Sequence, residues 1–105
     1  MRRGEVWSVA LDPTRGSEQQ GSRPAVIISP DTMNDSLETK VIVPLTTKMK
    51  DWPSRVLTEF NFEKGQAMCE QIRTIDKSRL KEHSGSLSTI EIEQIKYTLR
   101  VLFTD

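Results

Sequence analysis

Arginine and threonine side chains stand at two junctions between polar segments and apolar runs of this sequence. Arg23 and Pro24 precede the apolar run 25–28, and Thr46 and Thr47 directly follow another apolar run. Proline fixes its own φ angle and disfavours helical backbone in the residue before it, so we expect Arg23 to be extended. A guanidinium held in this way suits a phosphate. A threonine hydroxyl beside it suits phosphoryl chemistry, although adjacent threonines are also ordinary residues at the end of a strand.

One phosphoryl reaction in particular fits these residue types. RNA carries its own nucleophile, the 2′-hydroxyl group, so cleavage through that group needs neither a metal ion nor a nucleophilic side chain. It needs groups that stabilise charge on the phosphate and groups that move protons. Arg23 and Thr46 could stabilise the charge, and the residue pattern does not identify the group that moves the proton.

Patterns for other kinds of chemistry are weak. His83 is the single histidine, and its polar neighbours Lys-Glu-His-Ser-Gly are typical of a solvent-exposed loop. Cys69 is the single cysteine, which excludes an intramolecular disulfide, and neither residue has a partner at metal-ligand spacing. The sequence contains no glycine-rich phosphate-binding motif. We therefore expect no metal and no cofactor.

Length and composition indicate one small domain, residues 1–105. The 15 basic and 15 acidic residues give a formal net charge of zero, so any nucleic-acid site must be a local patch. No apolar run is long enough to span a membrane, and the N-terminus lacks a signal-peptide core, so we expect a cytoplasmic protein without membrane contact. A domain this small is only modestly stable alone, and a dimer interface would help.

Short strands dominate the first three quarters of the chain. The segment 12–24 between the first two strands holds no large apolar side chain, and a polar connector of this length is either functional or a plain surface loop. Pro44 is expected to mark a strand end or an edge. We expect turns at 29–39, 48–54 and 59–65. The strands are predicted at 6–11, 25–28, 41–43, 55–58 and 66–75, a spacing that favours a small barrel.

The C-terminal residues change from strand to helix periodicity. Ser88 and Glu91 form a capping box, and Leu87 is placed for a hydrophobic staple with Ile92. An apolar stripe at helical spacing then predicts an amphipathic helix that closes the barrel. A further helical turn is expected at 76–80. The stripe consists of Ile92, Ile95, Leu99 and Leu102.

Four long motifs in this sequence resemble those of the MazF/PemK family of toxins from type II toxin–antitoxin systems. They occur in the order of the family and cover nearly the whole chain. The motifs are Arg3-Gly4-Glu5-Val6-Trp7; residues 12–24 with Asp12-Pro13-Thr14, Gly16-Ser17-Glu18-Gln19, Gly21 and Arg23-Pro24; Val43-Pro44-Leu45-Thr46-Thr47; and Gln71-Ile72-Arg73-Thr74-Ile75-Asp76-Lys77.

The resemblance implies a mainly β fold with a C-terminal α-helix, a small SH3-like barrel of the PemK/CcdB type that acts as a homodimer. It implies a metal-independent, sequence-specific endoribonuclease that cleaves single-stranded mRNA and so inhibits translation and growth. The products would carry 2′,3′-cyclic phosphate and 5′-hydroxyl ends. A cognate antitoxin would neutralise the toxin, and operator DNA would be bound only through the toxin–antitoxin complex. Arg23 and Thr46 match the arginine and threonine held to be catalytic in MazF-like members.

The sequence departs from some PemK-like members at three positions. Ser17 stands where those members have a histidine, Met68 where they have an arginine, and Glu70 where they have an aspartate. The chain therefore follows the MazF-like branch, and a histidine base at position 17 is absent. Arginine is a poor base because its pKa exceeds 12. Glu18 is the alternative base, and its other role would be to order the loop.

A second set of residues is expected to bind RNA. Trp52 follows two lysines in the segment after Thr47, and an exposed aromatic ring there could stack an unpaired base. A core or dimer-interface tryptophan is the alternative. The expected RNA-binding residues are Thr47, Lys48, Lys50, Trp52, Glu70 and Gln71.

Two other functions remain open at this point. A CcdB-like gyrase poison of the same fold relies on a C-terminal Trp-Gly-Ile tail, and this chain ends Val101-Leu102-Phe103-Thr104-Asp105, which argues against it. The other alternative is a non-catalytic barrel that serves only as a binding module.

Overall fold

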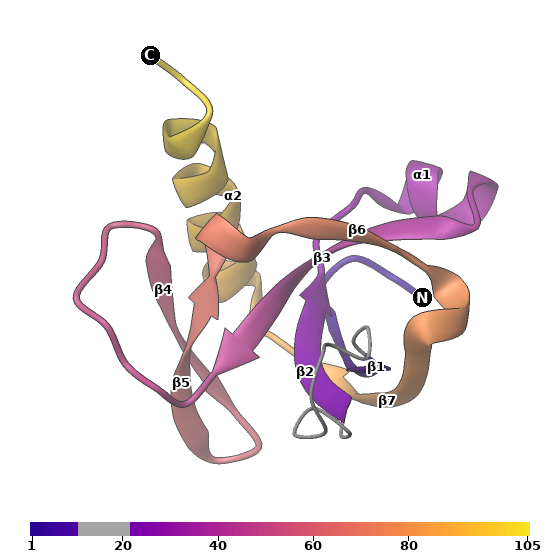
Figure 1. The fold of residues 1–105 in the computed structure, drawn as a ribbon, viewed down its shortest axis with the longest axis horizontal. Helices are drawn as coiled ribbons and strands as arrows, with labels where there is room; N and C mark the ends of the chain where they lie inside the picture. The colour runs from indigo at the N-terminus through magenta and orange to yellow at the C-terminus, as the bar shows by residue number, and fades with distance from the viewer. Residues whose placement is uncertain (11–21) are drawn as a thin grey trace, which may run out of the picture.

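The computed structural model describes residues 1–10 and 22–105 of the chain. Within these residues, seven strands form one antiparallel sheet that curls into a half-barrel, and a helix follows the last strand (Figure 1). The predicted β-rich fold with a C-terminal helix is confirmed. The elements in chain order are β1 (Glu5–Ala10), β2 (Ser22–Ile27), α1 (Asp31–Ser36), β3 (Thr39–Thr46), β4 (Arg55–Phe60), β5 (Glu63–Met68), the 3₁₀ turn η1 (Cys69–Gln71), β6 (Arg73–Asp76), the 3₁₀ turn η2 (Lys77–Arg79), β7 (Leu80–Ser86) and α2 (Thr89–Leu102).

β3 is the central strand of the sheet. One edge pairs with β2, and the other edge pairs first with β6 over 39–42 and then with β5 over 45–46. Pro44 was expected to mark a strand end or an edge, and it does not end the strand, because β3 continues through it to Thr46. Pro44 lies between the two sets of pairs on the second edge, and such a break in the ladder tolerates a residue without an N–H group.

Three further segments differ from the sequence prediction. The single strand expected over 66–75 is divided by η1 into β5 and β6. β5 pairs with β4 and with residues 45–46 of β3, whereas β6 pairs with residues 39–42 of β3. The turn expected over 29–39 contains α1. His83 lies within β7 rather than in a loop, and its neighbours pair with β1. The helical turn predicted at 76–80 is present as η2.

The core consists of two apolar clusters, one on each face of the curled sheet. One cluster includes Val26 and Val43 and is covered by Ile95 of α2; the other includes Ile27 and Ile42. Side chains alternate between faces along a strand, so a continuous apolar run supplies both clusters. This explains why the run 25–28 contains no polar residue.

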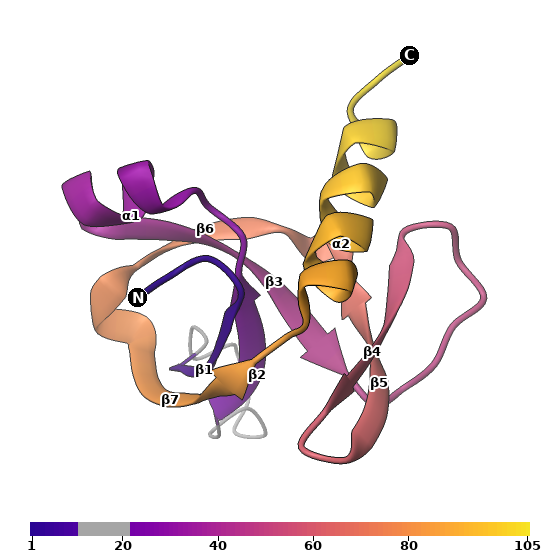
Figure 2. The same ribbon diagram turned by 180° about the vertical axis from the view of Figure 1, so that it is seen from behind.

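α2 begins at the predicted capping box. The Ser88 hydroxyl accepts a hydrogen bond from the Glu91 N–H (3.1 Å), and the Glu91 carboxylate accepts one from the Ser88 N–H (2.8 Å). Ile92 and Ile95 are buried against the sheet, whereas Leu102 at the end of the predicted stripe is exposed. Figures 1 and 2 both show α2 alongside β4. Among the described residues, no helix is long and apolar enough to cross a membrane.

β4 and β5 form a tight hairpin that extends from the sheet (Figure 2). Phe60 pairs with Glu63, so the turn contains only Asn61 and Phe62. Both turn residues have positive φ angles, 53° and 63°, as a type I′ turn requires. The turn predicted at 59–65 is therefore the tip of this hairpin.

Candidate active site

Arg23 and Thr46 lie in the same open cleft, which has a volume of about 380 Å³. In the pairing of β2 with β3, Ala25 lies opposite Pro44, and continuing this register by two residues sets Arg23 opposite Thr46. Residues directly opposite in an antiparallel pair have neighbouring side chains. The cleft is lined by Arg23, Pro24, Leu45, Thr46, Thr47, Lys48, Thr58, Phe60, Glu63, Lys64 and Gly65.

Gly65 allows β5 to approach the end of β3 closely. A Cβ atom at this position would overlap the backbone carbonyl oxygen of Thr46 and would lie 3.6 Å from the Cα atom of Thr47. Any other residue would push the two strands apart at the cleft. A glycine inside a strand often marks such a close backbone approach, so the sequence itself contains a signal for this contact.

The hydroxyl group of Thr46 is held by the chain that follows it. Its oxygen accepts a hydrogen bond from the backbone N–H of Lys48 (3.1 Å). A hydroxyl that accepts one bond can still donate its own hydrogen. Thr46 can therefore donate to a phosphate oxygen in the cleft without losing this contact.

Hydrogen bonds to Gln66 of β5 hold the segment 48–54 against the sheet. The buried side-chain amide of Gln66 accepts a hydrogen bond from the Lys50 N–H (3.0 Å) and donates one to the Lys50 carbonyl (2.9 Å). With one donor and one acceptor, the Gln66 amide forms the same two hydrogen bonds with Lys50 that a residue of a neighbouring strand would form. They hold the segment that carries Lys48 and Lys50 beside the cleft.

Arg55 joins this segment to η1. Its guanidinium donates to the Glu70 carboxylate (2.8 Å), to the Gln66 amide oxygen (3.1 Å) and to the Lys48 carbonyl (3.4 Å). Only 6% of the Arg55 side chain is exposed. The Trp52 ring covers the guanidinium at 4.6 Å from its centroid. Arg55, Glu70 and Gln66, with Trp52 above them, are called the Arg55 bracket below.

Glu70 is predicted to bind RNA, and the structure places it in the Arg55 bracket and outside the lining of the cleft. Its carboxylate accepts hydrogen bonds from the Ser54 hydroxyl (2.7 Å) and from Arg55. Burial alone would raise the pKa of Glu70, but these hydrogen bonds and the charge of Arg55 outweigh it, and the pKa falls below its ordinary value. Gln71, the next residue in η1, is exposed.

The other predicted RNA-binding residues differ in position. Thr47 and Lys48 line the cleft, and Lys50 is exposed on the segment beside it. Trp52 is 48% exposed, which excludes the alternative of a core tryptophan within the described fold. Its face is partly covered by Arg55, and the Lys50 ammonium lies 5.6 Å from its ring centroid. Ser17 and Glu18 lie outside the described residues.

His83 and Cys69, the single histidine and the single cysteine, lie outside the lining of the cleft. His83 stacks on Trp7 (5.3 Å between ring centroids), and its Nε2 atom is 2.9 Å from the Gly85 carbonyl oxygen. Cys69 is fully buried, and burial together with the neighbouring Glu70 raises its thiol pKa to about 11, so it is not a thiolate at neutral pH. Within residues 1–10 and 22–105, no group of three or more His, Cys, Asp or Glu side chains could hold a metal ion.

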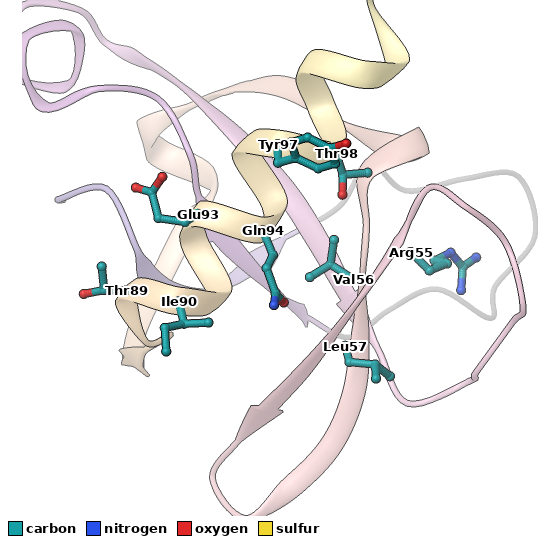
Figure 3. A pocket seen from close by; sticks show the side chains of 9 residues that line it. All are labelled: Arg55, Val56, Leu57, Thr89, Ile90, Glu93, Gln94, Tyr97 and Thr98. Carbon is teal, nitrogen blue, oxygen red and sulfur yellow. The ribbon is translucent and has the colours of Figure 1, made fainter.

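A second hollow of about 580 Å³ lies between β4 and α2 (Figure 3). Its large apolar side chains are exposed: Leu57 is 66%, Ile90 71% and Tyr97 62% exposed. We call it the apolar groove. It is lined by Arg55, Val56, Leu57, Thr89, Ile90, Glu93, Gln94, Tyr97 and Thr98.

Comparison with known proteins identifies relatives along nearly the whole chain. A family model described as PemK-like, MazF-like toxin of type II toxin-antitoxin system matches residues 2–103. The chain is 38% identical to endoribonuclease MazF9 of Mycobacterium tuberculosis, a match that covers 96% of this chain and 94% of that protein. It is 35% identical to the endoribonuclease toxin MazF of Escherichia coli, with 94% and 90% covered.

The fold is also similar to solved structures. An endoribonuclease from a mycobacterial species, determined in complex with its cognate antitoxin, superposes with a TM-score of 0.82 at 24% sequence identity. The match covers 96% of this chain and 92% of that one. The curled sheet and the C-terminal helix are therefore features that the two chains share.

Proposed function

Because this chain belongs to the family of PemK-like, MazF-like toxins of type II toxin–antitoxin systems, we propose that it is a toxin that cleaves single-stranded mRNA with sequence specificity. The observation that carries this proposal is the single cleft that contains both Arg23 and Thr46. Cleavage of mRNA would stop translation and growth. Because mRNA is translated in the cytoplasm, the enzyme would act there.

The proposed reaction uses the 2′-hydroxyl group of the RNA. The 2′-oxygen loses its proton and attacks the phosphorus, and the bond from phosphorus to the 5′-oxygen breaks. The 5′-oxygen takes up a proton, which leaves a 2′,3′-cyclic phosphate and a 5′-hydroxyl end. Arg23 stabilises the negative charge that develops on the phosphate, and the Thr46 hydroxyl donates to a phosphate oxygen. No step requires a metal ion or a cofactor.

Proton transfer is assigned to the segment 12–24. Glu18 is the proposed base, with Ser17 beside it as a residue that orders the site. Both lie outside the described residues, so the assignment rests on the resemblance of their motif to the family. RNA on either side of the cleaved bond would be bound by Thr47, Lys48, Lys50 and Gln71, with Trp52 stacking a base.

The apolar groove supports a proposal about assembly. Exposed apolar side chains that cluster on one face favour burial against another protein. We assign this face to a second copy of the chain, so that Leu57, Ile90 and Tyr97 are buried in a two-fold homodimer. A cognate antitoxin would then neutralise the dimer by covering the RNA cleft with an acidic segment that folds on binding. Operator DNA would be bound only through that complex.

Incubation with a long single-stranded RNA in excess EDTA tests this function. We expect cleavage at a small set of sequences at an undiminished rate, with cyclic phosphate and 5′-hydroxyl ends on the products. Loss of cleavage on chelation, restored by Mg²⁺ or Mn²⁺, would overturn the metal-independent reaction. Intact RNA under every condition, with a folded protein, would leave a binding module or a gyrase poison in its place.

A further inference from the structure

The tip of the β4–β5 hairpin holds an aromatic residue in an unfavourable backbone conformation. Phe62 has a φ angle of 63° and a side chain that is 100% exposed. Left-handed backbone is costly for residues with a Cβ atom, and the second position of a type I′ turn is normally glycine. Asparagine, as at position 61, tolerates this conformation because its side chain bonds locally. Phenylalanine has no such compensation.

No packing of the Phe62 ring within the described fold offsets this backbone strain. A fully exposed ring buries no apolar surface, so Phe62 contributes nothing to the core. Strained residues of this kind cluster at functional sites, where binding of a partner uses them. The combination of strain and full exposure therefore indicates a residue that binds a ligand.

The position of the hairpin identifies the kind of ligand. Phe60 and Glu63, the paired residues that flank the turn, both line the cleft that holds Arg23 and Thr46. Phe60 is partly buried and packs against the core, whereas the Phe62 ring is fully exposed. Lys64, the next residue but one after Phe62, lines the same cleft and can bind a phosphate. Phe62 thus stands at the rim of a cleft with phosphate-binding side chains.

We propose that Phe62 stacks an unpaired nucleobase of the RNA strand that lies in this cleft, a role that rests on the proposed endoribonuclease function. A planar ring with a free face suits a base in single-stranded RNA. A protein partner is less suited, because a protein interface would need an apolar patch there. The exposed residues next to Phe62 along the hairpin are polar, namely Glu59, Asn61, Glu63 and Lys64. The stacked base would also explain why glycine is absent.

The substitution Phe62→Gly tests this inference, because its two expected effects have opposite signs. Glycine relieves the backbone strain, so the thermal unfolding midpoint should rise by a few degrees. Loss of the ring should weaken RNA binding by about 5- to 150-fold, the range for removal of one base-stacking aromatic. Binding is measured with an oligonucleotide that spans a mapped cleavage site and carries a 2′-deoxy nucleotide at that site. The cleavage rate at saturating RNA should change little.

Asn61→Gly is the matched control. It changes a turn residue that already tolerates the left-handed backbone and removes no aromatic ring, so the unfolding midpoint should change little while RNA affinity stays unchanged. Phe62→Trp should restore binding, and Phe62→Leu, which is apolar but not planar, should not.

Three outcomes would overturn the inference in distinguishable ways. If the wild type cleaves RNA and Phe62→Gly binds it equally well, the stacking role alone is wrong. If Phe62→Gly dissociates the dimer, the ring belongs to a protein interface. If the wild type neither binds nor cleaves single-stranded RNA, the proposed function fails and the stacking role fails with it.

Discussion

The cleft that contains Arg23 and Thr46 and the apolar groove differ in the chemistry of their walls. The cleft of about 380 Å³ holds Arg23, Thr46 and Lys64, whereas the larger groove of about 580 Å³ exposes Leu57 and Ile90. Hydroxyl and cationic groups can stabilise a developing charge, and exposed apolar groups can only gain free energy by leaving water. We therefore assign catalysis to the cleft, although it is the smaller of the two hollows.

One strand connects these two regions. β4 contributes Thr58 and Phe60 to the cleft and Leu57 to the groove. Arg55, at the start of the same strand, borders the groove and donates to the carbonyl of Lys48, whose N–H holds the Thr46 hydroxyl. A second chain bound in the groove would thus pack against the strand that positions the cleft. The four predictions that follow separate catalysis at the cleft from assembly at the groove.

The largest effect is expected from Arg23→Ala. Loss of a positioned donor to a transition-state oxyanion typically reduces the rate by about 10²–10³-fold, or roughly 3–4 kcal/mol. Thr46→Val should fall in the same range because it removes the hydroxyl and keeps the branched shape, and Arg23→Lys should be impaired less than Arg23→Ala. The measurement is single-turnover cleavage of a mapped RNA site.

Folding and assembly should be unchanged in these variants, as judged by circular dichroism and light scattering. RNA affinity should fall far less than the cleavage rate, because the contacts act mainly in the transition state. Lys81→Ala, an exposed cation on β7 outside the cleft lining, is the control and should cleave normally. A folded Arg23→Ala that cleaves at nearly the wild-type rate would show that the catalytic assignment is wrong.

Ile90→Asp should weaken dimer formation, and it should not act directly on the cleavage step. Ile90 is 71% exposed in the single chain, so the substitution leaves the fold intact, but a charge buried in an interface without a partner is costly. We expect the dimer dissociation constant to rise by about 10- to 100-fold, an effect of roughly 1.4–2.7 kcal/mol. Leu37→Asp, at an exposed leucine that follows α1, should leave the dimer intact. An Ile90→Asp protein that remains dimeric on dilution would contradict the assignment of the groove.

How well the sequence predicted these regions depends on the distance between interacting residues along the chain. The capping box of Ser88 and Glu91 and the helical stripe after it are local patterns, and α2 begins where they predict. Arg23 and Thr46 each flank an apolar run that forms a strand, and β2 and β3, the strands formed by these runs, pair with one another. Local patterns and strand ends therefore identified the helix and the pair of cleft residues.

The parts that the sequence did not predict depend on long-range contacts. Arg55 reaches Glu70 and Gln66 across 15 and 11 residues, and no periodicity connects them. The division of 66–75 into two strands depends on which edge of β3 remains open, a property of the assembled sheet. The strand assignment of His83 likewise depends on pairing with β1. These contacts can be predicted only after the sheet order is known.

Gly65→Ala should impair both stability and cleavage. The added methyl group would overlap the Thr46 carbonyl oxygen, so β5 and β3 must separate at the cleft. Overpacking of this kind costs about 1–3 kcal/mol, and a displaced Thr46 should lower the single-turnover rate by about tenfold or more, because small misplacements of catalytic groups are costly. Ile95→Val is the control: it lowers stability by about 0.5–1.5 kcal/mol in the core and should leave the rate per folded molecule unchanged. Normal cleavage by Gly65→Ala would show that the close approach does not position Thr46.

The smallest effect is expected from Glu70→Gln, and it should depend on pH. The pKa of Glu70 is lower in the folded protein than its ordinary value, so the carboxylate stabilises the fold above about pH 4.5 and loses this effect as the pH falls through its folded pKa. The unfolding midpoint of Glu70→Gln should therefore lie a few degrees below that of the wild type at pH 6–8, and the two curves should converge at lower pH. Other carboxylates with lowered pKa values, such as Asp31 and Asp76, remain in both proteins and do not affect the difference.

Measurement of cleavage tests whether the Arg55 bracket also affects the cleft that contains Arg23 and Thr46. Glutamine can still accept from Arg55 but carries no charge, so Lys48 should be held less firmly and the single-turnover rate should fall a few-fold. Glu38→Gln breaks an exposed ion pair of similar length with Lys77 (3.0 Å) and should change neither the midpoint nor the rate, since surface pairs contribute little. If Glu70→Gln abolished RNA binding and left the unfolding curve unchanged at every pH, Glu70 would contact RNA directly, and the Arg55 bracket would not be what positions the cleft.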